Sequence, residues 1–180
     1  RLGQALVDLK LATEADVAVV LGFIRALSVY EKLEHLVVAT EDDLRRWLFG
    51  PESVAEVVLA FEGDEPAGFA LFFRNFSTFL GRPGVYLEDL FVRDASRGRG
   101  IGKALLAHLA AVARERGYGR VEWAVLDWNQ PAIDFYRSLG ATVMDDWRIC
   151  RLTGDALERY RAAGGIVVLL SALEAFEASP

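Results

Sequence analysis

The chain has 180 residues and a formal net charge of −6, with 53% hydrophobic and 26% charged residues. This composition is typical of one globular domain that buries a core without disulfide staples. The acidic balance argues against nucleic acid as a partner, and no apolar run reaches membrane-spanning length. One cysteine excludes an internal disulfide, and two histidines leave no cluster for a metal. With no signal peptide visible, we expect a cytoplasmic protein without a membrane partner.

Hydrophobic periodicity predicts a mixed sheet with helices on both faces, in the order β-α-α-β-β-β-α-β-α-β, followed by one short helix. Strands are expected at residues 5–11, 54–61, 67–76, 85–92, 120–126 and 147–152. Helices are expected at residues 17–27, 41–49, 101–116, 131–139 and 155–163. Residues 1–163 are expected to form one domain, and residues 164–180 a tail whose structure the sequence does not indicate.

The central strand, residues 85–92, is rich in aromatic and β-branched residues. Period two predicts two faces, with Tyr86, Leu90 and Val92 on one and Leu87, Asp89 and Phe91 on the other. The strand is preceded by a predicted loop at residues 77–84, and it leads directly into the segment that carries the clearest chemical signal.

That segment is a basic loop rich in glycine that opens the next helix. Gly98, Gly100 and Gly102 allow backbone conformations that bring several N–H groups close to a ligand. These N–H groups stand at a helix N-terminus, which favours anions. The cations of the loop are Arg93, Arg97, Arg99 and Lys103. The loop predicts a phosphate or pyrophosphate site; the alternative is a basic turn whose glycines serve geometry alone.

Two common phosphate loops do not fit these residues. The dinucleotide fingerprint G-x-G-x-x-G needs glycine at position 103, which is Lys103. The P-loop needs glycine at position 97 and a hydroxyl at position 104, which are Arg97 and Ala104. The remaining pattern is Arg-x-x-Gly-x-Gly, formed by Arg97, Gly100 and Gly102.

This pattern resembles the pyrophosphate loop of the GNAT superfamily of N-acetyltransferases, which bind acetyl-CoA there. The resemblance covers residues 6–160 and is most specific for the diamine (spermidine/spermine) acetyltransferase branch and its thialysine-type relatives. The diamine-like motifs are Tyr86-Leu87-Glu88-Asp89, Asp127-Trp128-Asn129, Pro131-Ala132-Ile133 and Phe135-Tyr136, and the thialysine-like one is Asn75-Phe76-Ser77-Thr78. The resemblance implies the GNAT fold, acetyl-CoA as cosubstrate and no metal.

In this family acetyl-CoA lies between two splayed parallel strands, which the resemblance assigns to residues 86–92 and 120–126. Backbone groups of Leu90, Phe91 and Val92 would bind the pantetheine and polarise the thioester carbonyl. The pyrophosphate loop would comprise Arg97, Gly98, Arg99, Gly100, Ile101, Gly102 and Lys103. The pantetheine side would be lined by Asn129, Pro131 and Ala132.

Two residues match the proton-transfer groups of the family. The amine attacks the thioester directly, so a base must take a proton from an ammonium and an acid must protonate the departing thiolate. By residue match Glu88 is the base, acting through a water, and Tyr136 is the acid. The alternative for Glu88 is a solvated strand residue or a salt bridge to an arginine, and the alternative for Tyr136 is a core tyrosine.

Acidic residues indicate a cationic acceptor. The expected substrate-binding residues are Tyr30, Glu31, Glu88 and Asp89, whereas Glu34 is more typical of a solvated face. Ser77 and Phe79 stand where the diamine enzymes carry an acidic residue and a tryptophan. Losing that carboxylate brings a lysine-like amino acid into competition with long polyamines.

Three functions stay open at this point. The first is acetyl transfer to a small amine, either a diamine, a polyamine or a lysine/thialysine-like amino acid. The second is transfer to a protein N-terminus or lysine, which the acidic cleft disfavours. The third is an acetyl-CoA-binding module without turnover, which would need neither Glu88 nor Tyr136. A homodimer is also expected, because members of the family are commonly dimers.

Overall fold

The computed structural model describes residues 7–162, in two compact units that divide between Leu139 and Gly140. The first unit contains β1 (Val7–Leu11), α1 (Val17–Glu31), α2 (Glu41–Leu44), β2 (Glu56–Glu62), β3 (Glu65–Ser77), β4 (Arg82–Val92), α3 (Ile101–Glu115), β5 (Val121–Trp123) and α4 (Gln130–Ser138). The second contains α5 (Gly154–Ala162). Within these residues, no helix is both long and apolar enough to cross a membrane.

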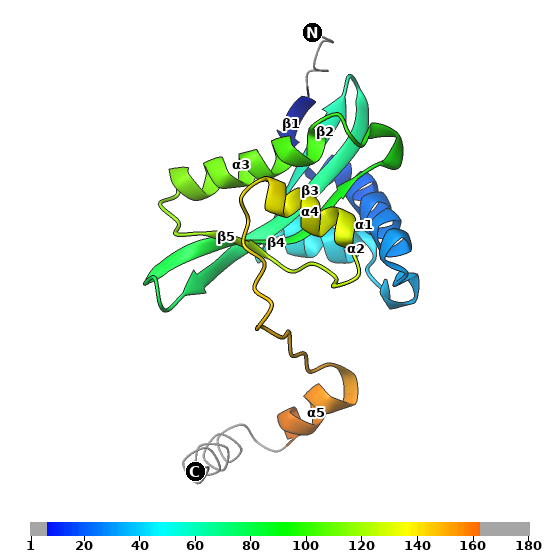
Figure 1. The fold of residues 1–180 in the computed structure, drawn as a ribbon. Coiled ribbons are helices and arrows are strands. Elements are labelled where there is room, and N and C mark those ends of the chain that lie inside the picture. The colour runs from blue at the N-terminus through cyan, green and yellow to red at the C-terminus, as the bar shows by residue number, and fades with distance from the viewer. Residues whose placement is uncertain (1–6, 163–180) are drawn as a thin grey trace. The chain divides into compact units, whose positions relative to one another are not determined.

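The five strands form one sheet in the order β1-β2-β3-β4-β5 (Figure 1). The first four strands pair antiparallel, and β5 joins β4 in parallel. This mixed sheet confirms the predicted α/β fold class. The parallel pairing is confined to Val85–Leu87 against Val121–Trp123. Over the rest of β4 toward Val92, the side of the strand that faces away from β3 is therefore not covered by a neighbouring strand of the described sheet.

Helices cover both faces of the sheet, as the sequence predicts (Figure 1). On one face α3 packs its apolar stripe, with Ile101, Leu105 and Leu109 all at most 1% exposed. On the other face α1 packs Val17 and Val20 against buried residues of β2 and β3. Because each helix presents an apolar stripe and the sheet is apolar on both faces, two separate core layers form.

A β-bulge at Glu88 corrects the predicted faces of the central strand. Leu71 pairs with Asp89 and Phe72 pairs with Leu87, so Glu88 is the extra residue of β4. A bulge shifts the side-chain alternation by one residue. Leu87 therefore shares the α3 face with Leu90 and Val92, whereas Phe91 packs with α1 on the other face. The prediction that placed Leu87 with Phe91 is wrong for this reason.

The structure accounts for both ends of the helix predicted at residues 41–49. Thr40 caps α2: its hydroxyl accepts from the Asp43 N–H at 3.2 Å, and the Asp43 carboxylate accepts from the Thr40 N–H at 2.9 Å. After Leu44 the helix continues as one π-helical turn, Arg45–Phe49, so the predicted extent is confirmed. It ends at Gly50, where a Cβ atom would lie 2.5 Å from the carbonyl oxygen of Arg46.

The predicted boundaries differ from the structure at two strands, and one predicted strand is wrong. The expected loop at 77–84 shrinks to a short turn because β4 begins at Arg82. β5 spans only Val121–Trp123 of the expected 120–126. Residues 147–152 form no strand, and Trp147 and Ile149 are 71% and 70% exposed. Apolar alternation is not sufficient for a strand, because a strand also needs a hydrogen-bonded neighbouring strand. Among the described residues, no strand pairs with residues 147–152.

A pair of glycine substitutions tests the packing that holds the central strands together. A Cβ atom at Gly68 would lie 2.7 Å from the Phe91 carbonyl oxygen, whereas one at Gly22 of α1 would meet nothing within 4 Å. We expect Gly68→Ala to lower the free energy of unfolding by about 1–3 kcal/mol, because the close approach of β3 to β4 leaves no room. We expect Gly22→Ala to raise it by about 0.5–1 kcal/mol through helix propensity. Urea unfolding of both variants measures the contrast, and equal effects would contradict it.

Candidate active site

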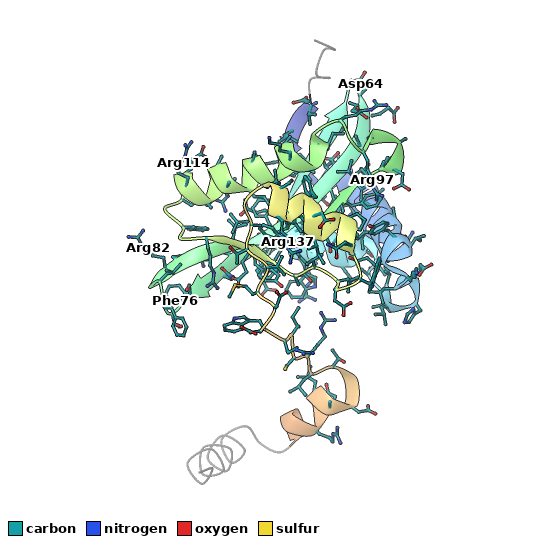
Figure 2. All side chains as sticks on the ribbon, viewed as in Figure 1. Asp64, Phe76, Arg82, Arg97, Arg114 and Arg137 are labelled. Carbon is teal, nitrogen blue, oxygen red and sulfur yellow. The ribbon has the colours of Figure 1, made fainter. Side chains whose placement is uncertain are left out.

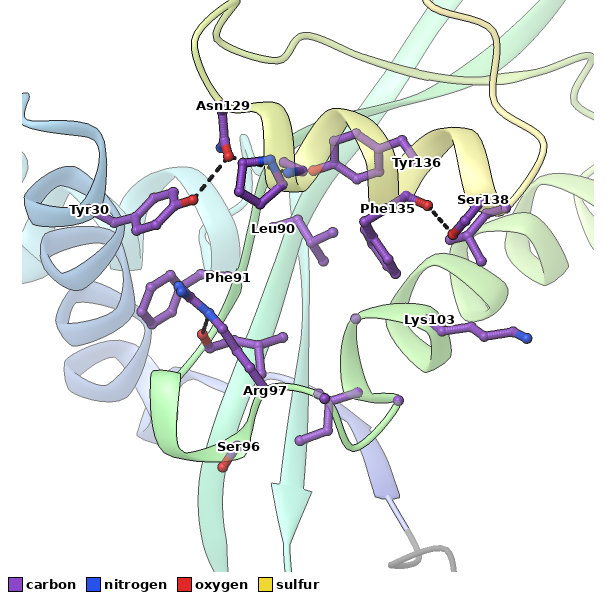
Figure 3. Close-up of a pocket in the computed structure, with 18 of the residues that line it drawn as sticks. Tyr30, Leu90, Phe91, Ser96, Arg97, Lys103, Asn129, Phe135, Tyr136 and Ser138 are labelled. Atoms are coloured by element: carbon purple, nitrogen blue, oxygen red, sulfur yellow. Dashed lines mark hydrogen bonds between the residues drawn. The ribbon is translucent and has the colours of Figure 1, made fainter.

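A cavity of about 530 Å³ lies along the part of β4 that β5 does not cover (Figure 3). Its wall combines the end of α1, β4, the loop before α3, the first turn of α3, and α4. The predicted site residues on this wall are Tyr30, Leu90, Phe91, Val92, Arg97, Gly98, Gly100, Ile101, Gly102, Lys103, Asn129, Pro131, Ala132 and Tyr136. The tertiary structure thus brings segments from three separate regions of the sequence into one site.

The glycine-rich loop presents backbone N–H groups at one end of this cavity. Gly98 and Gly100 have φ values of 75° and 87°, which side-chain-bearing residues rarely adopt. The N–H groups of the first helical turn have no acceptor within a helix. Ala104 is the first residue of α3 whose N–H reaches a loop carbonyl, that of Gly100, at 2.9 Å. Free N–H groups at a helix start, beside Lys103, fit a phosphate group.

The cations of the loop have different roles. The Arg97 side chain lines the cavity, with its guanidinium carbon 4.8 Å from the centre of the Tyr30 ring. Its Nε donates to the Val92 carbonyl at 3.1 Å, and it pairs with Asp94 at 2.9 Å. Arg99 does not line the cavity, although the sequence suggested it as a ligand; instead its guanidinium pairs with Glu62 at 2.9 Å.

A hydrogen bond links α1 to α4 at the cavity. The Tyr30 hydroxyl donates to Asn129 Oδ1 at 2.9 Å, between residues 99 positions apart (Figure 3). The same oxygen accepts from the Ala132 N–H at 3.3 Å, so Asn129 caps α4. Asn129 is only 7% exposed. Its side chain is thus held through Oδ1 by two donors at the cavity wall.

Tyr136 on α4 lies on the cavity wall with its ring packed between aromatic neighbours. The ring centre is 5.0 Å from that of Trp123 and 5.4 Å from that of Phe135. Burial raises the pKa of Tyr136 to about 12, and the nearby Glu31 and Tyr30 add to the effect. The hydroxyl therefore stays protonated at neutral pH and can act as a proton donor.

Three carboxylates interact around the end of α1 and the bulge in β4. Burial raises the pKa of Asp89 to about 6, and the neighbouring charges of Glu88 and Glu31 act in the same direction. Burial also raises the pKa of Glu31. Glu88 itself is exposed at the bulge. Because Glu31 acts on both Asp89 and Tyr136, the acidic group lies beside the cavity without forming its wall.

Five residues on the wall were not among the predicted site residues, namely Leu27, Ser96, Phe135, Ser138 and Leu139. Of these, Phe135 stood in the Phe135-Tyr136 motif, and the structure shows what its ring contacts. A Cβ atom at Gly102 would lie 3.4 Å from Phe135 Cζ, so a glycine in the loop matches a large ring on α4. Leu27 belongs to the apolar stripe of α1, and nothing local distinguishes a stripe residue that faces a cavity from one that faces the core.

No group of three or more histidine, cysteine, aspartate or glutamate side chains suited to a metal ion occurs among the residues that the structure describes. The single cysteine, Cys150, is a free and exposed thiol in the second unit. Among the groups at or beside the cavity are backbone N–H groups, the protonated phenol of Tyr136 and the carboxylates of Glu31 and Asp89.

Comparisons with known proteins identify the family of the chain. Residues 23–141 match the acetyltransferase (GNAT) family. The L-ornithine N5-acetyltransferase of Arabidopsis thaliana is 37% identical, over 83% of this chain and 86% of that protein. The thialysine N-epsilon-acetyltransferase of Bos taurus is also 37% identical, over 86% and 96% of the two chains.

A solved structure shares the fold. An integron cassette protein from the mobile metagenome of V. cholerae superposes with a TM-score of 0.72 and 29% identity, over 88% of this chain and 99% of that one. The family match covers the loop, both halves of the cavity wall and Tyr136. The chain belongs to the GNAT family of acetyltransferases and is an N-acetyltransferase.

Proposed function

We propose that this enzyme transfers an acetyl group from acetyl-CoA to a primary amine of a small cationic substrate, by direct attack in a ternary complex. The observation that carries the proposal is the single cavity that joins an anion-binding helix start to a buried, protonated tyrosine, Tyr136. Acetyl-CoA would supply the activated acyl group and a pyrophosphate for the loop.

The chain's own residues account for the binding of such a cosubstrate. The N–H groups at the start of α3 and the ammonium of Lys103 suit the pyrophosphate. Leu90, Phe91 and Val92 offer an apolar strand whose backbone is not covered by β5. Such backbone groups can pair with an extended, amide-containing chain as a neighbouring strand would. The fixed side chain of Asn129 faces them from α4.

The same residues account for the proton transfers. The reaction joins the amine nitrogen to the acetyl carbon, breaks the carbon–sulfur bond and removes two protons from an ammonium, of which one ends on the thiol and the other in solvent. Glu88 accepts a proton through a water, and its exposure at the bulge of β4 gives it access to solvent. Tyr136 supplies a proton to the departing sulfur.

The acidic group indicates the kind of amine. Glu31, Glu88 and Asp89 attract a cation, and the charges that act on Asp89 are those of the two other carboxylates. Ser77 is buried at 4% exposure, and its hydroxyl accepts from the Leu80 N–H at 3.3 Å, so it serves the turn between β3 and β4. Phe79 is 97% exposed. The absence of a carboxylate at Ser77 favours a short substrate over a long polyamine.

The names of the two similar enzymes suggest the same class. L-Ornithine and thialysine are both amino acids that carry a primary amine at the end of the side chain, and each is the acceptor named for one of these relatives. We therefore favour an amino acid with a terminal side-chain amine as the acceptor of this enzyme, ahead of diamines and spermidine.

Free-thiol release from acetyl-CoA across a panel of amines tests the proposal. The panel would contain ornithine, lysine, thialysine, putrescine, spermidine and a peptide with a free N-terminus. We expect the highest kcat/KM for an amino acid with a side-chain amine. Turnover on the peptide alone would indicate a protein acetyltransferase, and CoA binding without turnover on any acceptor would indicate a binding module.

A further inference from the structure

The carboxylate of Glu62, the last residue of β2, is bound by the loop that precedes α3. One carboxylate oxygen accepts from the Arg99 guanidinium at 2.9 Å, and the other accepts from the Ser96 hydroxyl. The Glu62 side chain is 18% exposed. These two hydrogen bonds, that from Ser96 first, hold the pKa of Glu62 below its usual range. The carboxylate is therefore ionised and shared between two loop donors.

The two donors flank one part of the loop that lines the cavity, and Ser96 is itself on the cavity wall. Ser96 is 8% exposed and ends a short 3-10 turn, and Arg99 stands immediately before Gly100. Between them lie Arg97 and Gly98, both on the cavity wall. Glu62 thus holds the loop at two points, one on either side of Arg97 and Gly98, and the second point lies immediately before the first turn of α3.

Because Glu62 belongs to β2, its two hydrogen bonds also tie the loop to the sheet. A backbone hydrogen bond does the same where the loop begins. The N–H of Arg93 donates to the Ala67 carbonyl at 2.9 Å, where the chain leaves β4 beside β3. The pair between Arg97 and Asp94 lies within the loop itself and does not anchor it to the sheet. Asp64, at the tip of the β2–β3 hairpin, lies at the same end of the fold as Arg97, whereas Phe76 and Arg82 lie at the other end (Figure 2).

We propose that Glu62 is a positioning residue that pre-organises the loop for the phosphate groups of the cosubstrate. Arg99 acts on the loop through Glu62 and not on the ligand. The inference rests on the proposed use of acetyl-CoA and extends it to a residue outside the cavity. A ligand that binds to a loop already in place does not have to order it, and affinity improves by that difference.

Glu62→Gln tests this role, because the glutamine keeps one acceptor oxygen and turns an amide NH2 toward a donor. We expect the KM for acetyl-CoA and the Kd for CoA to rise about tenfold, the effect of losing one charge-assisted hydrogen bond, with kcat at saturation unchanged. Glu65→Gln is the matched control: Glu65 is the cross-strand partner of Glu62 in the same hairpin and is exposed. That variant should bind CoA as the wild type does.

Arg99→Gln and the double variant complete the test. If Arg99 acts through Glu62, Arg99→Gln also weakens CoA binding, and adding Glu62→Gln weakens it little further. Unchanged affinity in Glu62→Gln would overturn the proposal, and tighter binding would show instead that Glu62 competes with phosphate for Arg99. Failure of the wild-type protein to bind CoA would overturn the proposed function itself. That result is distinct from any difference in CoA affinity between the variants and the wild type.

Discussion

Replacing Tyr136 with phenylalanine is expected to lower kcat by about 10²–10³-fold, the usual contribution of a positioned general acid, while the affinity for acetyl-CoA stays within about twofold. The variant keeps the ring that packs against Trp123 and Phe135 and removes only the hydroxyl. Because burial raises the pKa of Tyr136 to about 12, the wild-type hydroxyl holds its proton throughout the neutral range. Thiol release gives kcat, and calorimetric titration with CoA gives the affinity.

Tyr118→Phe is the matched control for this change. Tyr118 is partly buried against the α3 face of the core and does not line the cavity. Its phenylalanine variant should turn over at the wild-type rate. A rate for Tyr136→Phe equal to that of this control would exclude Tyr136 as the acid, and a parallel loss of CoA affinity would mean that the hydroxyl supports the cavity instead.

Replacing Asp89 with asparagine is expected to weaken amine binding and to stabilise the protein, two effects of opposite sign from one buried charge. In the folded protein the pKa of Asp89 is raised from 3.8 to about 6. At about pH 8 the carboxylate is charged and attracts the ammonium of the substrate, so the asparagine variant should have a KM for the amine about tenfold higher. In the wild type, amine binding should weaken as the pH falls through about 6, because Asp89 then becomes neutral.

The stability effect follows from the same raised pKa. Between pH values near 3.8 and 6 the folded protein holds a proton that the unfolded chain releases, so stability is lost as the pH rises through this window. Asparagine carries no charge and avoids the loss. We expect Asp89→Asn to be more stable than the wild type by about 1–3 kcal/mol at about pH 8, and the difference to vanish toward about pH 4. Urea unfolding across this range measures it.

Glu88→Gln separates the roles of the two neighbouring carboxylates. Glu88 is exposed, so its substitution should change the free energy of unfolding much less than Asp89→Asn does. As the proposed base it should lower kcat by about 10²-fold when replaced. If Asp89→Asn lowers kcat by that amount and Glu88→Gln does not, then the buried carboxylate is the base. For Asp89→Asn, a gain in the free energy of unfolding that is the same at about pH 4 and about pH 8 would contradict the argument from the raised pKa of Asp89.

Much of the fold could be predicted because its signals are local. The apolar stripe of α3 and the glycines of the loop each depend on residues within a few positions of one another. The segments that form the cavity wall also carried recognisable motifs. The fold class, the loop and the α4 segment could therefore be predicted from the amino-acid sequence.

What the sequence left undecided depends on distant partners. The bulge at Glu88 has no local signature, because it is defined by the register of β4 against β3, and it reverses the faces that simple alternation predicts. Arg99 has the charge and the loop position expected of a phosphate ligand, yet its guanidinium forms an ion pair with Glu62, which is 37 positions away. Residues 147–152 had the pattern of a strand and found no partner among the described residues.

The sequence by itself determined the family through its resemblance to GNAT motifs, and that resemblance supplied the proposed acid and base. It also predicted the anion-binding loop, because spacing along a short segment specifies a helix start and the residues it presents. Only the tertiary structure decided which charges meet. It buries Asp89 near Glu31, joins Tyr30 to Asn129 by a hydrogen bond and pairs Arg99 with Glu62. Pairing and desolvation of charges depend on atoms brought together across the chain, and no local pattern encodes them.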